Sequence, residues 1–280
     1  MRAARQLHVT PSAISNALAR LELGDPLVIR SGRGVVPTTR AARLAPSLKR
    51  ALSEIERAIQ PDGFDPATTN RQFTLAIADA GQLSRLPLLT KSLANEMPRS
   101  QLRVVGIDTY LASGGITGAE VDVGIVGGAE KAPGIHSTAL YKEDSVLVAR
   151  KGHPRVSPQI TKTQLGQLQH VEVQVAPGRG YRELARSYAR LNIKREVAVV
   201  VPSFIAAAAV VAQTDFVGTL PASLVDVLGE RLGLRVVTAP APRITIDIKL
   251  VWHDRTDDDP AMRAFREVVI RAMGRSKESG

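Results

Sequence analysis

Residues 7–38 read LHVTPSAISNALARLELGDPLVIRSGRGVVPT, and this stretch decides the first part of the fold. A helix is predicted to begin after Thr10, because a threonine hydroxyl is a good N-cap and Pro11 has the φ angle of a first helical position. Apolar residues recur at helical spacing, which predicts one face that packs inward: Ile14, Leu18 and Leu21.

The other face of this helix carries side chains that are small or form hydrogen bonds and are not acidic: Ser12, Ser15, Asn16 and Arg20. Such a face can lie against base edges in the major groove of DNA. Gly24-Asp25-Pro26 is predicted to end the helix and turn the chain. The polar face is therefore a candidate recognition surface for duplex DNA.

A short hairpin is predicted next, with extended pieces at residues 27–30 and 35–38. Its tip, Ser31-Gly32-Arg33-Gly34, is basic, and Arg30 and Arg33 are placed to contact phosphates as a wing does. A small helical domain without a ligand can also carry a serine-rich helix. Helix, turn and basic hairpin in this order favour DNA binding.

The stretch resembles the start of the LysR-type transcriptional regulators. The shared residues are Ala3, Ala4, residues 7–10 and 13–15, Leu21, Glu22, Gly24, Pro26, Leu27 and Arg30. Val28 stands where the family usually has Phe, and residues 36–41 replace the usual Leu-Thr-Pro-Ala-Gly. The resemblance implies a winged helix-turn-helix over residues 1–38 that binds double-stranded promoter DNA. Ser12 and Asn16 are expected to contact base edges, and Ser15, Arg30 and Arg33 to contact phosphates.

Members of that family begin with a further helix, whereas this chain starts with Met1-Arg2 just before the Ala pair. We therefore expect an N-terminally truncated domain that binds DNA poorly, whereas a full-length one would bind as a dimer or a pair of dimers. Each apolar side chain of residues 11–21 that the further helix would bury loses about 1.5–3 kcal/mol of burial free energy when that helix is absent. The alternative is a small-molecule sensor that has lost DNA binding.

Composition and charge agree with a cytoplasmic regulator. The net charge is +10, and residues 1–60 hold ten Lys and Arg against four Asp and Glu, whereas the remainder is nearly balanced. A basic first part suits phosphate contact. The absence of Cys excludes disulfides, thiolate catalysis and Cys-based metal sites. We find no apolar run that could span a bilayer and no export signal, so no membrane association is expected.

Residues 39–60 are predicted to form a linker helix. Apolar residues step along it by three and four, with charged residues between them: Ala41, Leu44, Leu48, Ala51, Ile55 and Ala58. This near-heptad stripe favours pairing with a second copy of the helix, although a helix packed on its own domain would show a similar pattern. Pro46 is expected to kink the helix or delay its start. Residues 61–66 then mark a domain boundary.

The rest of the chain, residues 61–280, alternates short apolar strands with helices, which predicts parallel α/β sheets. The predicted strands are residues 73–78, 102–107, 121–126, 145–149, 171–175, 197–201, 216–220, 234–238 and 244–252. The predicted helices are residues 83–96, 181–191, 204–213, 222–228 and 260–273. We find no internal repeat.

Ligands of such sheets bind beyond the carboxyl ends of the strands, where loops and helix N-termini expose N–H groups. Three candidate segments follow strands in this way: Asp79-Ala80-Gly81, Gly127-Gly128, and Ser203 with Phe204 at the start of a helix. Turn formation alone would explain each segment by itself. Because all three fall at the same kind of position, they predict a ligand pocket.

Several motifs of this part resemble the branch of the LysR-type family that responds to salicylate, nitroaromatics and flavonoids: residues 64–66, 71–79, 201–204, 214–215, 220–221, 252–253 and 259–260. The branch implies a periplasmic-binding-protein-like sensor with two subdomains, I at residues 71–149 and 247–280 and II at residues 150–246. The chain would cross between them near residues 149–151 and 242–246. The effector would be a small aromatic acid or phenol held in the cleft between them.

Two further candidates for the effector site come from the same resemblance. His170 matches a branch position that contacts the effector, although a lone His beside a strand is more often structural. Tyr110 aligns with another position that lines the cleft, but Gly114-Gly115 and Gly118 make its loop unlike those of its relatives.

The sequence gives little support to an enzyme. Its five His residues are scattered, with no pair at metal-binding spacing, and no metal or cofactor site is expected. Gly178-Arg179-Gly180 is a turn, and Ser113 and Ser203 lack the Gly-x-Ser-x-Gly context of a nucleophile. A secreted solute-binding protein would share the fold of the second part, but the basic first part and the absent export signal disfavour it.

Overall fold

A computed structural model of the 280-residue chain describes residue 4 and residues 9–20, 26–31, 34–58, 64–118, 120–128, 132–157, 159–174, 182–241 and 244–274. The chain divides into two compact units, Met1–Gly63 and Phe64–Gly280, and each is described here by itself.

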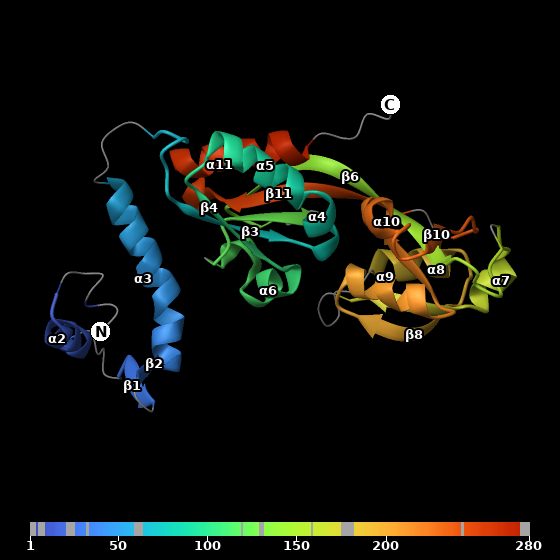
Figure 1. The fold of residues 1–280 in the computed structure, drawn as a ribbon, viewed down its shortest axis with the longest axis horizontal. Coiled ribbons are helices and arrows are strands. Elements are labelled where there is room, and N and C mark those ends of the chain that lie inside the picture. The colour runs from blue at the N-terminus through green and yellow to red at the C-terminus, as the bar shows by residue number, and fades with distance from the viewer. Residues whose placement is uncertain are drawn as a thin grey trace. The chain divides into compact units, whose positions relative to one another are not determined.

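The first unit contains the predicted helix and hairpin (Figure 1). Helix α2 (Pro11–Arg20) is capped by Thr10, whose hydroxyl accepts a hydrogen bond of 3.2 Å from the Ala13 N–H. Strands β1 (Val28–Ser31) and β2 (Gly34–Pro37) pair antiparallel, with Arg30 opposite Val35.

Helix α3 (Thr39–Ala58) follows β2 at once. The Thr38 hydroxyl donates to the Pro26 carbonyl at 3.0 Å and accepts from the Ala41 N–H at 3.2 Å, so one side chain both anchors the hairpin and caps α3. Because this cap fixes the first turn, the helix begins well before Pro46 and runs through it. The predicted delay of the helix by Pro46 is therefore wrong.

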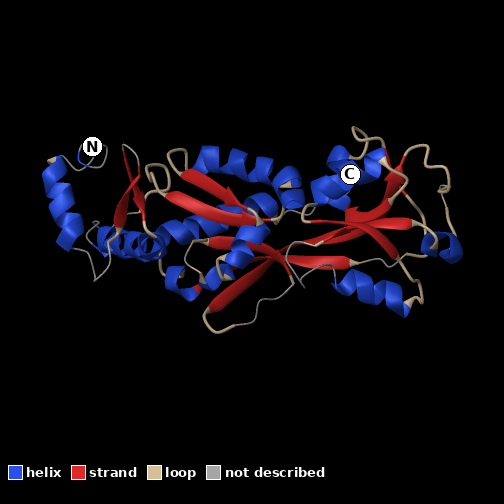
Figure 2. Cartoon of the chain, turned by 90° about the horizontal axis from the view of Figure 1, so that it is seen from below, coloured by secondary structure: helices blue, strands red, loops and turns tan. Residues whose placement is uncertain are grey.

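In its described part, the second unit is built on one nine-stranded sheet, in the order β4-β3-β5-β11-β6-β9-β7-β8 with β10 beside β6. Figure 2 shows strands in red with helices in blue around them. The strands are β3 (Gln72–Ile77), β4 (Gln101–Val105), β5 (Val123–Gly127), β6 (Ile135–Arg150), β7 (Gln169–Val173), β8 (Glu196–Val201), β9 (Val217–Pro221), β10 (Leu234–Val236) and β11 (Thr245–His253).

Two long strands, β6 and β11, run through the middle of this sheet. Strand β6 pairs antiparallel with β11 from Ile135 to Asp144 and then with β9 from Ser145 onward. The pairs β3–β4, β3–β5, β7–β8 and β7–β9 are parallel. The predicted parallel pairing is therefore found within each group, whereas the central strands are antiparallel because β6 crosses from one parallel group to the other without an intervening helix.

We call β3, β4 and β5 with their helices the first lobe, and β7, β8, β9 and β10 with theirs the second lobe. The first lobe has α4 (Asp79–Ser84), α5 (Leu86–Glu96), α6 (Ile107–Ala112) and α11 (Pro260–Met273). The second has α7 (Lys162–Gly166), α8 (Arg182–Arg190), α9 (Phe204–Gln213) and α10 (Ala222–Leu228). The helix predicted over residues 83–96 begins earlier, as α4, and α5 follows it after Arg85.

Each lobe has its own hydrophobic core. In the first lobe, Phe73 of β3 stacks on Phe265 of α11 with ring centroids 4.4 Å apart. In the second, Phe204 of α9 packs with Leu224 of α10 and with residues of β7 and β9. Ala80 of α4 is buried in this second core, so α4 of the first lobe makes an apolar contact with the second lobe.

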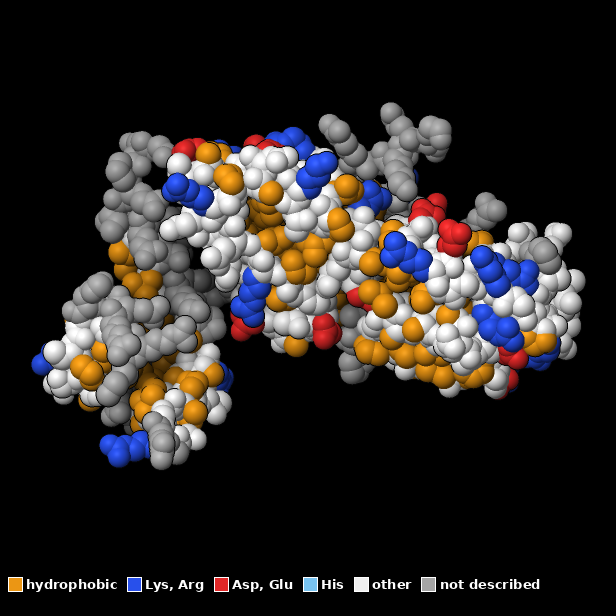
Figure 3. Space-filling view, viewed as in Figure 1, with side chains coloured by type: hydrophobic (Ala, Val, Ile, Leu, Met, Phe, Trp, Pro, Cys, Tyr) orange, Lys and Arg blue, Asp and Glu red, His pale blue; other side chains and the backbone are white. Residues whose placement is uncertain are grey.

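Strand β8 lies at one end of the sheet, and Figure 3 shows hydrophobic side chains gathered along the part of the molecule where it lies. Two of its valines, Val197 and Val200, are exposed. In the described part of the chain, no helix has the length and hydropathy needed to cross a membrane.

Candidate functional site

The polar face of α2 is exposed as a group. Ser12, Ser15, Asn16 and Arg20 are all exposed, whereas Ile14 and Leu18 are half-buried. Arg30 is exposed on β1, and Arg33 lies outside the described residues. Within the first unit, the amphipathic pattern therefore leaves hydrogen-bonding side chains available on one helix face, together with a cation on the hairpin.

Some of the candidate residues of the second unit meet at Asp79, the first residue of α4. One oxygen of its carboxylate, Oδ2, accepts hydrogen bonds from the Ser203 hydroxyl at 2.7 Å and from the Ile205 N–H at 2.9 Å. The other oxygen, Oδ1, accepts from the Ala80 N–H at 2.9 Å. Asp79 of the first lobe thus binds the N-terminus of α9 in the second lobe, where a negative charge is favoured.

Ser203 also caps α9 in the ordinary way, since its Oγ accepts from the Ala206 N–H at 3.0 Å. Ala80 and Phe204 directly follow Asp79 and Ser203 in the chain, and both are buried in the second-lobe core. The structure therefore brings together Asp79, Ala80, Ser203 and Phe204, which were predicted separately from two distant segments. The N–H groups of Ile205 and Ala206 already have partners here.

A second carboxylate makes a similar contact that the sequence did not predict. Glu143 of β6 accepts from the Ser223 N–H at 3.1 Å and from the Ser223 hydroxyl at 2.7 Å, at the start of α10. The sequence does not predict this half of β6 as a strand, because two buried residues, Leu140 and Tyr141, are adjacent and most of the residues around them are exposed, so the alternating pattern of a strand is missing. Ser223 lies inside the helix predicted over residues 222–228, and its side chain does not cap that helix, so no local signal points to Glu143.

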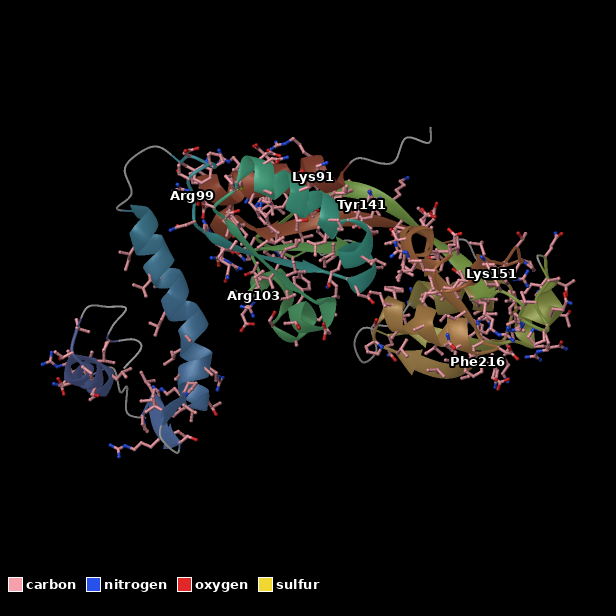
Figure 4. All side chains as sticks on the ribbon, in the orientation of Figure 1. Lys91, Arg99, Arg103, Tyr141, Lys151 and Phe216 are labelled. Carbon is pink, nitrogen blue, oxygen red and sulfur yellow. The ribbon has the colours of Figure 1, made fainter. Side chains whose placement is uncertain are left out.

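Tyr141 is another residue that the sequence did not single out. It lies beside α4 (Figure 4): the Arg85 guanidinium is stacked over its ring at 4.4 Å from the centroid. A Cβ atom on Gly81 would lie 3.8 Å from the Tyr141 hydroxyl and 2.7 Å from Ile77, so Gly81 permits this close packing. Burial raises the pKa of Tyr141 to about 12 although Arg85 opposes the shift, and the hydroxyl therefore stays protonated.

The glycine pair at the end of β5 is exposed. A Cβ atom on Gly127 would lie 2.9 Å from the Ile246 side chain. Gly128 has a φ of +89°, a left-handed conformation that favours glycine, and no atom lies within 4 Å of its Cβ position. Gly127 therefore allows close packing against Ile246, and Gly128 leaves open space beside it.

Tyr110 and His170 lie inside cores. Tyr110 is 0% exposed and packs with Ile116 and Val121 in the first lobe. His170 is 1% exposed, meets Tyr188 edge-on at 5.7 Å, and has its Nε2 3.4 Å from the Leu165 carbonyl oxygen. Burial, with a smaller contribution from Arg195, lowers the pKa of His170 to about 4, so the ring is neutral near pH 7.

Comparison with known proteins agrees with this arrangement. Residues 67–274 match the family model described as LysR substrate binding domain, and residues 1–42 match that described as bacterial regulatory helix-turn-helix protein, lysR family. The HTH-type transcriptional activator NahR of Pseudomonas putida is 31% identical over 95% of this chain and 90% of its own. NagR of Ralstonia sp is 31% identical over 96% of this chain and 90% of its own.

Among solved structures, a probable transcriptional regulator from Pseudomonas aeruginosa superposes with a TM-score of 0.77. It is 29% identical, and the superposition covers 97% of this chain and 91% of that one. A helix-turn-helix segment joined to a ligand-binding α/β domain defines a DNA-binding regulator controlled by a small molecule, and not an enzyme. The chain belongs to the LysR family of transcriptional regulators. The predicted family, fold class and kind of function are confirmed.

We predict that His170 makes stability depend on pH. Its pKa is lower in the folded chain than the value near 6.5 expected for an unfolded one, so the unfolded state binds the extra proton between these values. Stability is therefore full above about pH 6.5 and falls as the pH is lowered toward about 4. From about pH 7.5 to about pH 5, His170 should account for about 2 kcal/mol of the loss.

Urea unfolding of the full chain at several pH values measures this effect. The His170→Gln variant should lose less stability on acidification than the wild type. Identical pH dependence in His170→Gln and the wild type would show that His170 is not the titrating group.

Proposed function

We propose that this LysR-type regulator binds dyad-symmetric promoter DNA as a dimer or a pair of dimers, and that its effector is a small aromatic carboxylate or phenol. The aromatic part is supported by the resemblance to the salicylate-responsive branch and by the similarity to NahR and NagR. The observation that carries the anionic part is the carboxylate of Asp79 at the N-terminus of α9.

The Asp79 carboxylate already occupies the N-terminus of α9, and its contacts indicate which kind of ligand group could bind there. A carboxylate there receives one hydroxyl and one backbone N–H hydrogen bond and lies at the positive end of the helix dipole. An effector carboxylate could make the same contacts only by displacing Asp79. We propose that this exchange releases the contact between α4 and α9 and shifts the balance between lobe arrangements.

The surrounding residues suit the remainder of such a ligand. The exposed Gly127-Gly128 lets a ligand approach the backbone, and Tyr141 beside Gly81 supplies a neutral hydroxyl. The buried Ala80 and Phe204 offer apolar contact once the lobes separate. Tyr110 and His170 remain proposed contacts, and both require a rearrangement that exposes them. The predicted subdomain boundaries likewise stay a proposal.

We also propose that α3 pairs with the α3 of a second copy. Within the first unit, three apolar side chains of α3 are exposed at 48%, 59% and 58%: Leu48, Leu52 and Ile55. They are spaced by four and three residues and so form one stripe. Large exposed apolar side chains that line one face of a helix are characteristic of a surface that pairs with another helix.

The effector proposal is tested with Asp79→Asn. Asparagine keeps the shape but is a weaker competitor for the helix N-terminus, because hydrogen bonds to a charged group are roughly twice as strong as neutral ones. Salicylate should bind this variant roughly tenfold more tightly, a difference of about 1.4 kcal/mol. Calorimetry on the full chain measures it, with benzoates, phenols, amino acids and sugars as the comparison panel.

Asp108→Asn is the matched control, since Asp108 is an exposed carboxylate on α6 of the same lobe. Unchanged or weaker salicylate binding in Asp79→Asn would rule out displacement. Tight binding of a sugar or an amino acid, with no aromatic acid binding, would overturn the effector class.

For DNA recognition, Asn16→Ala should relax base preference at one position of the site, because a good base contact contributes about 1–3 kcal/mol of discrimination. Arg30→Ala should weaken binding to all sequences alike and lower the salt slope by about one. Binding-site selection followed by anisotropy titrations at several salt concentrations separates these effects. An altered base preference in Arg30→Ala, with none in Asn16→Ala, would reverse the assigned roles.

For pairing, Leu52→Glu should weaken self-association at least tenfold, because the pairing surface would bury an uncompensated charge. Sedimentation of the full chain should then move from a multiple of 30.0 kDa toward 30.0 kDa. Arg43→Glu is the control, since residue 43 lies nine positions earlier and so on the opposite face of α3. A wild-type distribution for Leu52→Glu would place the pairing surface elsewhere.

A further inference from the structure

The second lobe contains a groove of about 490 Å³ between the loop that follows β6 and helix α7. Its lining consists of Pro154, Arg155, Val156 and Ser157 from the loop, with Gln164, Gln167 and Leu168 at and after α7. Lys151, labelled in Figure 4, stands where the loop leaves β6. None of the lining residues belongs to the set around Asp79, so the groove is a separate feature.

The loop side of this groove is held in place by side chains beneath it. His153 is 5% exposed; its Nδ1 accepts from the Arg155 N–H at 3.1 Å and its Nε2 donates to the Asp215 carbonyl at 2.9 Å. The Arg235 guanidinium donates to the Val156 carbonyl from β10. These contacts use backbone groups of the loop, so the groove is preorganised before any ligand arrives.

The polar groups that face solvent here have unused hydrogen-bonding capacity. Among the described residues, neither the Arg155 guanidinium nor the Gln167 amide has a side-chain partner. Gln164 uses its Oε1 to accept from the Thr161 N–H at 2.8 Å, which leaves its amide hydrogens available. Val156 and Leu168 are buried and give the groove an apolar floor.

The segment that forms the groove carries charges of one sign. The chain from Ser145 to Val171 contains no Asp or Glu, while it contains Arg150, Lys151, Arg155 and Lys162. Arg150 is paired with Asp215 at 2.6 Å, whereas Arg155 is not paired within the described residues. An unpaired guanidinium on a fixed loop matches the two oxygens of a carboxylate.

We propose that this groove is a second ligand site, for a small hydroxylated organic carboxylate. The Arg155 guanidinium binds the carboxylate, and the amides of Gln164 and Gln167 bind hydroxyl groups. The Ser157 hydroxyl already donates to the Gln159 carbonyl, so it accepts a hydrogen bond from a ligand hydroxyl. The carbon chain lies on Val156 and Leu168. The volume lies within the range of small-molecule sites, about 300–1,000 Å³. The site would give the regulator a second small-molecule input besides the effector site.

Gluconate is the probe, because it combines one carboxylate with several hydroxyl groups. In calorimetry on the full chain, gluconate should bind and uncharged glucose should not. Arg155→Gln should weaken gluconate binding at least tenfold. Lys162→Gln, a neighbouring cation outside the lining, should change it less than twofold.

Asp79→Asn separates this proposal from the effector proposal, since gluconate binding should be unaffected in that variant. The second site would be overturned by the absence of gluconate binding at millimolar concentration. Equal effects of Arg155→Gln and Lys162→Gln would also overturn it, as would a change in gluconate affinity in Asp79→Asn.

Discussion

The antiparallel ladder between β6 and β11 is the constraint on which the second unit depends. Because β6 pairs with β11 up to Asp144 and with β9 from Ser145, one continuous strand belongs to both lobes. The Ser145 N–H donates to the Ile244 carbonyl at 2.9 Å at the point where the partner changes. This strand fixes the order of the sheet, and so it determines which strand ends and helix N-termini face the opposite lobe.

With the strands in this order, the lobes contact each other through hydrogen bonds to carboxylates and through apolar packing. The carboxylates of Asp79 and Glu143 bind the starts of α9 and α10, while Ala80 enters the core that holds Phe204. A charged group at a helix N-terminus is stabilised by typically 0.3–1 kcal/mol when exposed, and more when partly buried. Contacts of this size can be exchanged for those of a ligand without unfolding either lobe, which is what a regulator needs of a movable contact.

The sequence predicted the helices that carry strong local signals. The bounds of α9, α10 and α11 agree with those expected, because Ser203 and Asp259 cap two of them and Pro260 occupies the first position of α11. Elements with weak local signals were missed. The first half of β6 has exposed His136, Ser137 and Ala139, so its apolar pattern is too sparse to indicate a strand, and the short α6 and α7 have too few turns to show a period.

Side-chain burial was harder to predict than secondary structure. Spacing alone could not indicate that the ring of His170 faces Tyr188 inside a core, because a residue in a strand can face either a core or a cleft with the same neighbours in sequence. Nor could it show that the acceptor at the start of α9 is Asp79, since the two are brought together by a contact across 124 residues. The sequence indicates both ends of this contact as ligand candidates, and a position that can bind a carboxylate from another molecule can also bind one from its own chain. Where such a site is already filled from within, the affinity for a ligand is the difference between two binding free energies. A change at the internal carboxylate should therefore alter the response to the effector more than a change at any residue that only lines the cleft.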